Sequence, residues 1–164
     1  GTGSSGTITF SSIPSTYSSL QIRARMRNTT AATTASSLRV RFNGDTASNY
    51  AHHTLSGDGS AAAATGTSPQ GYINVANCNP CDSVASNIMG VSIIDLHDYA
   101  STTKNKVSRA LSGADSNAAD TTFKIVLSSG LWVNTAAITS IDLVSATGSW
   151  TTSTVFSLYG IRGS

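Results

Sequence analysis

Strict alternation of apolar and polar residues in two segments is the feature that most constrains the fold. In the first segment the apolar residues occupy every second position, with polar residues between them (apolar Leu20, Ile22, Ala24 and Met26; polar Gln21, Arg23, Arg25 and Arg27). Residues 36–45 repeat the pattern and end in an Asn-Gly-Asp turn signal. A period of two is typical of a β-strand that turns one face to a core. These segments therefore predict strands whose apolar faces are covered by other parts of the chain.

Further short strands follow along the chain, separated by Gly, Asn, Asp and Ser. We predict them at residues 7–10, 49–55, 72–75, 89–96, 104–111, 122–127, 138–144 and 154–161. A helical period is absent from the sequence pattern. Eight to ten short strands at this spacing predict an all-β protein, a jelly-roll-like antiparallel β-sandwich formed as one domain over residues 1–164.

Two regions carry more specific expectations. Residues 57–87 contain four consecutive alanines, several Gly and Pro residues and both cysteines, which predicts one long loop or insertion with a strand only at 72–75. Residues 89–96 form a nearly continuous apolar run, which predicts a strand covered on both faces.

The composition limits the classes of molecule that the chain can be expected to bind. With 164 residues and 39% hydrophobic content, the chain can bury a core without a disulfide or a metal. Charged residues make up 11% and the net charge is +2, whereas nucleic acids and anionic membranes require a dense field of cations. No run of eighteen apolar residues occurs in the sequence. We therefore expect neither nucleic acid nor a membrane as a partner.

Five of the ten Lys and Arg residues lie in the two alternating segments (Arg23, Arg25, Arg27, Arg39 and Arg41). If the two strands are neighbours, these arginines form one basic face. Because a guanidinium binds a carboxylate through two parallel hydrogen bonds, this face is a candidate contact surface for a protein carrying Asp or Glu. The alternative is a solvated face that discourages aggregation of sheet edges.

Cys78 and Cys81 have the Cys-x-x-Cys spacing of disulfide, zinc and redox sites. A tetrahedral metal site needs two more ligands, and the sequence has no second such pair. We predict a local Cys78–Cys81 disulfide or two unpaired thiols, with a His-assisted metal site or redox chemistry as less favoured alternatives. No cofactor or metal is expected.

Histidines next to carboxylates are the other candidates for chemistry. His52 and His53 are adjacent in a predicted strand and point to opposite faces, so both cannot bind one metal. Asp95 and His97 share a face, which is half of a hydrolase arrangement, but no nucleophile motif accompanies them. We expect Asp95, His97 and Asp98 to cap a strand or to pair with nearby cations at Lys104, Lys106 or Arg109, and the protein not to be an enzyme.

Trp132 and Trp150 lie beside predicted loops. Aromatic rings stack on sugars, so the pair could form a carbohydrate platform. The alternative, which we favour, is that both residues pack in the core or under loops.

Several segments, in order from Ile8 to Ile161, resemble a recurrent family of structural modules in tailed-bacteriophage particles (ITFSSIPSTYSSLQIRARMR, LRVRFNGDTASNYAHHTLSGDGS, GVSIIDLHDYASTTKNKVSRALSG, SGLWVNTAAITSIDL and FSLYGI). The resemblance implies a β-sandwich and a virion structural role without catalytic residues. It is weakest over residues 61–87.

Three functions follow as hypotheses. The first is a capsid decoration (cement) protein, a homotrimer on the outer surface of the phage particle, bound to the major capsid protein or other virion proteins. The second is the tip of a tail or head fibre that binds a receptor or a host-surface glycan. The third and weakest is an esterase-like enzyme built on Asp95 and His97.

Overall fold

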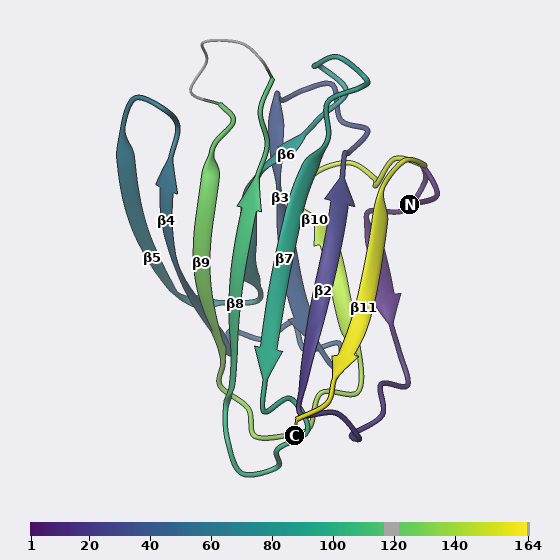
Figure 1. The fold of residues 1–164 in the computed structure, drawn as a ribbon, viewed down its shortest axis with the longest axis vertical. Helices are drawn as coiled ribbons and strands as arrows, with labels where there is room; N and C mark the ends of the chain where they lie inside the picture. Colours follow the sequence, from purple (N-terminus) through teal and green to yellow (C-terminus); the bar gives the residue numbers. More distant parts are fainter. Residues whose placement is uncertain (117–121, 164) are drawn as a thin grey trace.

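Two antiparallel sheets face each other, and the two alternating segments contribute one strand to each (Figure 1). The computed structural model describes residues 1–116 and 122–163, apart from the side chain of Cys78. The smaller sheet has the order β1 (Thr7–Phe10), β10 (Ile141–Ser145), β3 (Ala35–Phe42) and β6 (Ile73–Pro80). The larger sheet has the order β11 (Val155–Ile161), β2 (Ser19–Met26), β7 (Gly90–His97), β8 (Lys106–Gly113), β9 (Ile125–Trp132), β4 (Tyr50–Gly57) and β5 (Ala62–Gln70). The prediction of an all-β sandwich is confirmed.

The core lies between the sheets and is built from the apolar positions of the alternating segments. On β2, Leu20, Ile22 and Met26 are buried, and on β3 the buried residues are Leu38, Val40 and Phe42. Full burial of each such side chain stabilises the fold by about 1.5–3 kcal/mol. Since both strands turn their apolar faces to this one core, their polar faces point in opposite directions.

Both tryptophans belong to the core. Trp132 packs between Phe42 and Tyr50, with ring centroids at 5.6 and 6.2 Å, and Trp150 meets Phe156 edge to face at 5.2 Å. Each indole is at most 1% exposed. The packing interpretation is therefore confirmed, and neither ring is available as a sugar platform.

The prediction of a long loop over residues 57–87 is wrong, because β5 lies within it and the strand predicted at 72–75 extends as β6 to Pro80. With β5 the strands described number eleven. β5 consists of small residues that are mostly exposed on both faces, so it has no apolar period. On β6, Ile73 and Val75 are buried in the core, but asparagines and Pro80 at the end of the strand conceal the pattern.

The prediction that residues 89–96 are covered on both faces is also wrong. On β7 the residues Ser92, Ile94 and Leu96 are buried, whereas Val91 and Ile93 on the other face are exposed. A continuous apolar run therefore marks a strand with one face in the core and a second apolar face outside it.

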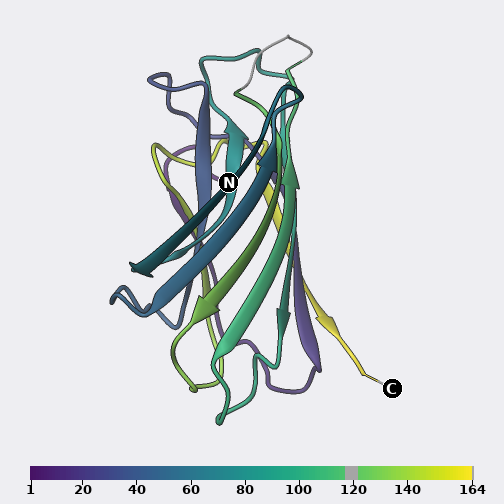
Figure 2. The ribbon, with the colours of Figure 1, turned by 90° about the vertical axis from the view of Figure 1, so that its left-hand side faces the viewer.

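The connections fit a sandwich, while the jelly-roll wiring stays unconfirmed. β7, β8 and β9 are consecutive neighbours in one sheet, and β4 and β5 form a hairpin beside them. Figure 2 looks at the molecule from the side of this hairpin, with β5 nearest to the viewer. Within the described residues no helix is long and apolar enough to cross a membrane.

Candidate protein-docking face

The outer face of the larger sheet is the surface turned away from the core, and it is open to solvent. Figure 1 looks onto this face, and no other described segment lies in front of its central strands. On β7, β8 and β9, buried and more exposed positions alternate along the strand. The residues on this face are therefore set by strand register, and their chemistry shows what the face can contact.

Six aliphatic side chains between 44% and 59% exposed form a continuous patch on this face, which we call the aliphatic band (Leu55, Val91, Ile93, Leu111, Ile125 and Leu127). Four of them stand side by side on adjacent strands, because Ile93 pairs with Leu111, Leu111 with Leu127, and Leu127 with Leu55. Contiguous apolar patches on a protein surface mark contact sites for other molecules. The aliphatic band is thus the strongest candidate site on the described surface.

Gly113 makes the aliphatic band concave. It stands between Val91 and Ile125 in the next row of the sheet, where the missing side chain leaves a shallow depression that Ile93 and Leu111 also line. A protruding apolar side chain of a partner could fill this depression.

The usual pattern of apolar residues inside and polar residues outside is inverted at several positions of β8 and β9. Ser108, Ser112 and Ser128 point into the sandwich and are buried, while Leu111 and Leu127 point out. Because leucine gains free energy on burial and serine does not, this register is unfavourable for an isolated sheet. It becomes favourable when another surface covers the leucines.

Close approach of β6 explains why the inward positions are small. The Ser112 hydroxyl donates to the Val75 carbonyl oxygen at 3.0 Å and lies 2.7 Å from the Ser92 hydroxyl. A Cβ atom on Gly130 would lie 2.4 Å from Ile73 Cγ2. Large side chains cannot fit at these positions, and Leu111 and Leu127 stand on the other face.

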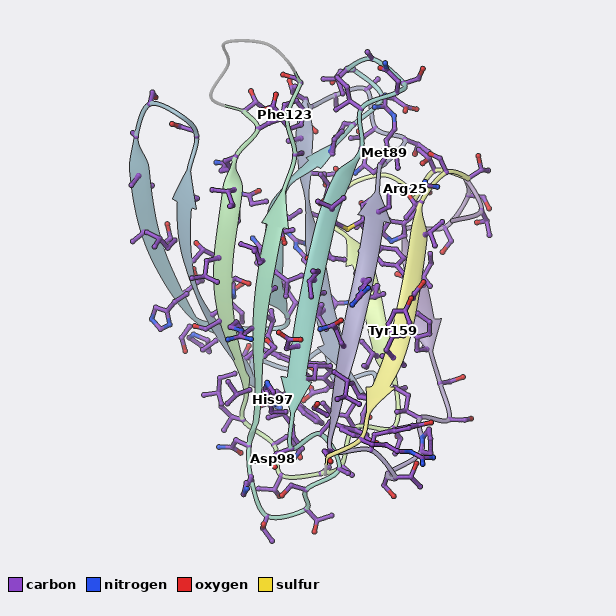
Figure 3. The ribbon with its side chains drawn as sticks, viewed as in Figure 1. Arg25, Met89, His97, Asp98, Phe123 and Tyr159 are labelled. Carbon is purple, nitrogen blue, oxygen red and sulfur yellow. The ribbon has the colours of Figure 1, made fainter. Side chains whose placement is uncertain are left out.

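Two arginines flank the aliphatic band on β2, where Arg23 pairs with Ile93 and Arg25 with Val91. Arg23 Nε donates to Gln21 Oε1 at 3.0 Å, and its guanidinium lies 5.4 Å from the ring centroid of Tyr159. Arg25, near the upper end of β2 in Figure 3, donates to the carbonyl oxygen of Ser153 at 3.3 Å. Neither forms an ion pair with any residue that the structure describes.

A polar row borders the other side of the band. Asp95 Oδ1 accepts from Gln21 Nε2 at 3.0 Å and Asp95 Oδ2 accepts from Arg109 Nη2 at 3.1 Å. The hydrogen bond from Gln21, and then that from Arg109, hold the pKa of Asp95 below its usual value against the effect of burial. Asp95 is thus already used within the protein, whereas Arg23 and Arg25 form no ion pair with a described residue.

Asp95 and Asp98 each form an ion pair with a cation of the chain. Asp95 bonds to Gln21 and Arg109, and Asp98 accepts from Lys104 Nζ at 2.8 Å. His97 and Asp98 lie together at the lower end of β7 in Figure 3. The predicted pairing with Lys104 and Arg109 is confirmed.

The prediction of one basic face on two neighbouring strands is wrong, because β2 and β3 belong to different sheets. Arg23 and Arg25 lie on the outer face of the larger sheet. Arg39 and Arg41 belong to the smaller sheet, where the Arg39 guanidinium covers the Tyr72 ring at 4.1 Å and Arg41 Nε donates to the Gly71 carbonyl oxygen at 3.0 Å.

Arg27 does not belong to an exposed basic face, because its side chain is buried. Its guanidinium donates to Asp82 and to three carbonyl oxygens of the segment after β6 (those of Val84, Ala85 and Ile88). Arg27 is therefore a structural residue that fixes this segment.

Cys81 is a free and buried thiol, which for this residue agrees with the alternative of unpaired thiols rather than with a Cys78–Cys81 disulfide. Its sulfur lies 3.6 Å from Thr33 Oγ1 and donates to the Asn79 carbonyl oxygen at 3.6 Å. Burial raises the pKa of the Cys81 thiol. The side chain of Cys78 lies outside the described residues.

The two histidines of β4 point to opposite faces, as predicted. His52 is buried and stacks on Tyr72, whereas His53 is exposed. Burial lowers the pKa of His52. Among the described residues no group of three or more His, Cys or Asp side chains could hold a metal ion.

Comparisons of the chain with protein-family models, with curated proteins and with solved structures found no match. A function must therefore be inferred from the aliphatic band and the charged residues beside it. The aliphatic band was missed at the sequence level, although part of its signal is visible: on β8 the inward positions on either side of Leu111 hold only the small residues Ala110 and Ser112.

Proposed function

We propose that this protein is a non-enzymatic structural protein of a tailed-phage particle, a capsid decoration (cement) protein that attaches through the aliphatic band to another virion protein. The exposed band carries this proposal, because it gives the fold a means of assembly. Burying the remaining exposed surface of each aliphatic side chain would add on the order of 1 kcal/mol. The assignment to a phage particle comes from the sequence resemblance.

The charges beside the band define the partner. Among the described residues Arg23 and Arg25 form no ion pair, so the complementary surface has an apolar centre with Asp or Glu along one side. A different virion protein, with the major capsid protein first, is therefore the proposed occupant.

A cement protein works without a chemical step. When one decoration subunit contacts neighbouring capsid subunits, removal of any of them also requires breaking the decoration contacts. The free energy needed to open the shell rises with each added subunit. A rigid sandwich with one apolar face suits this role, because little conformational entropy is lost on docking.

Cryo-electron microscopy of purified particles tests the location. We expect density of this fold on the capsid facets, with the larger sheet turned toward the shell. Density at the tail or fibres alone would contradict the cement assignment and favour the second hypothesis, a receptor- or glycan-binding fibre tip. Absence from the particle would contradict both.

A further inference from the structure

β5 is the outermost strand of the larger sheet, with a free edge that lacks the usual protection. It pairs with β4 and ends the strand order. Its nine residues include no charged side chain, and most are small and exposed. Natural edge strands are protected by charges, prolines or bulges. Here the proline and the register shift lie only at the far end, at Pro69 and between Tyr50 and His52.

The hydrogen-bonding groups on this free edge follow from the ladder between β4 and β5. The Asp58 N–H donates to the Ala61 carbonyl oxygen at 3.2 Å, which makes these two residues a hydrogen-bonded pair. Because such pairs alternate in an antiparallel ladder, residues 63, 65 and 67 turn toward β4. Ala62, Ala64 and Gly66 therefore each point one N–H and one C=O away from β4, along the open edge.

This edge is self-complementary. When two such strands run antiparallel about a two-fold axis at Ala64, each Ala64 faces its counterpart and each Ala62 faces Gly66 of the second copy. All the edge groups of these residues then form hydrogen bonds with the other strand. Only small, neutral side chains meet across the contact, so neither steric overlap nor like charge opposes it.

We propose that β5 pairs with β5 of a second copy of this chain to form a two-fold dimer with one continuous sheet, in place of the homotrimer expected from the sequence. The two-fold axis of an antiparallel strand pair is perpendicular to the sheet, so both outer faces point to the same side. On the basis of the proposed function, the dimer would present two aliphatic bands to one shell and attach with the avidity of a bivalent module. The pairing itself does not depend on that function.

The test is the mass of the full chain in solution, measured by sedimentation equilibrium over a range of concentrations. The wild type is expected to form a dimer and Ala64→Lys a monomer, because a lysine at the axis in both copies brings two ammonium groups together. Ala136→Lys is the matched control, since it adds the same charge at an exposed alanine in a loop after β9 and should leave the dimer intact. Circular dichroism establishes that each variant is folded.

Hydrogen exchange separates this contact from any other dimer. The amides of Ala62, Ala64 and Gly66 should exchange slowly in the wild type and lose that protection in Ala64→Lys. A single-chain mass at every concentration, a trimer, or a dimer whose edge amides exchange rapidly would overturn the proposal. A peptide of another protein added to this edge would protect the same amides without doubling the mass, and would overturn it too.

The two proposals fail separately. A band variant such as Leu111→Ser should reduce attachment to particles and keep the dimer. Ala64→Lys should abolish the dimer while each monomer keeps its intact band.

Discussion

Arg27 Nε donates to Asp82 Oδ1 at 3.2 Å, which joins the end of β2 to the segment that follows β6. The arginine side chain is 4% exposed and the aspartate 45% exposed. The two partners therefore differ in what their removal leaves behind. Loss of the arginine leaves three carbonyl oxygens without their donor, whereas loss of the aspartate leaves a guanidinium that keeps its other acceptors.

Arg27→Met is accordingly expected to lower the free energy of unfolding by about 1–3 kcal/mol, because three part-buried carbonyl oxygens lose their donor. Asp82→Ala should cost less, about 0.5–1 kcal/mol, since the carboxylate is half in water. Urea denaturation of both variants measures the difference. Equal losses would show that the ion pair, rather than the set of carbonyl contacts, fixes the segment.

Gly130→Ala tests the close approach of β6 to the larger sheet. The new methyl group would lie 2.4 Å from Ile73 Cγ2, so the strands must separate or Ile73 must move. We expect a loss of about 1–3 kcal/mol in the free energy of unfolding. Gly57→Ala is the control, because its nearest contact would be at 3.8 Å. A change of less than about 0.5 kcal/mol in Gly130→Ala would argue against the close approach.

Neighbouring substitutions on β8 test the inverted pattern. Leu111→Ser removes an exposed side chain and should change the free energy of unfolding by at most about 0.5 kcal/mol. Ser112→Ala removes a buried hydroxyl that donates to Val75 and should cost about 1 kcal/mol. Thermal denaturation compares the two. The opposite ranking would mean that β8 has the reverse register.

The phenol of Tyr50 provides a test in alkali. Burial raises the pKa of Tyr50 from 10.0 to about 12, and its hydroxyl accepts from the Phe42 N–H at 3.0 Å. A raised folded-state pKa means that the stability from the neutral phenol is complete below pH 10 and is lost as the pH rises through about 12. Tyr50→Phe should therefore flatten the stability profile between these pH values.

Tyrosinate absorbance and denaturation, recorded together across the alkaline range, measure this effect. Tyr159→Phe is the control, because that ring is 47% exposed. If both variants give the wild-type profile, Tyr50 does not carry the alkaline transition.

Strands with a clear alternation of apolar and polar residues could be located from the sequence. Which strands lie next to one another in a sheet could not be predicted. β2 and β3 could be predicted because their apolar positions alternate with arginines, but alternation does not say which sheet a strand joins. The arginines were therefore placed on one face when they lie on two. β5 was missed because a strand exposed on both faces needs no apolar residues.

The candidate site was hidden for a related reason. A period of two is the same whether Leu111 points into the core or out of it, and the register was settled only by the packing of Ile73 and Val75 on small residues. The ion pairs of Asp95 and Asp98 were predictable, since their partners lie on the next strand or in the turn before it.

Occupancy on purified particles tests most directly whether the aliphatic band attaches the protein to the virion. Leu111→Ser should sharply lower the number of copies bound to each particle. Val133→Ser, which alters a side chain 53% exposed in a loop outside the band, should bind like the wild type. Equal occupancy of wild type, Leu111→Ser and Val133→Ser would contradict the account.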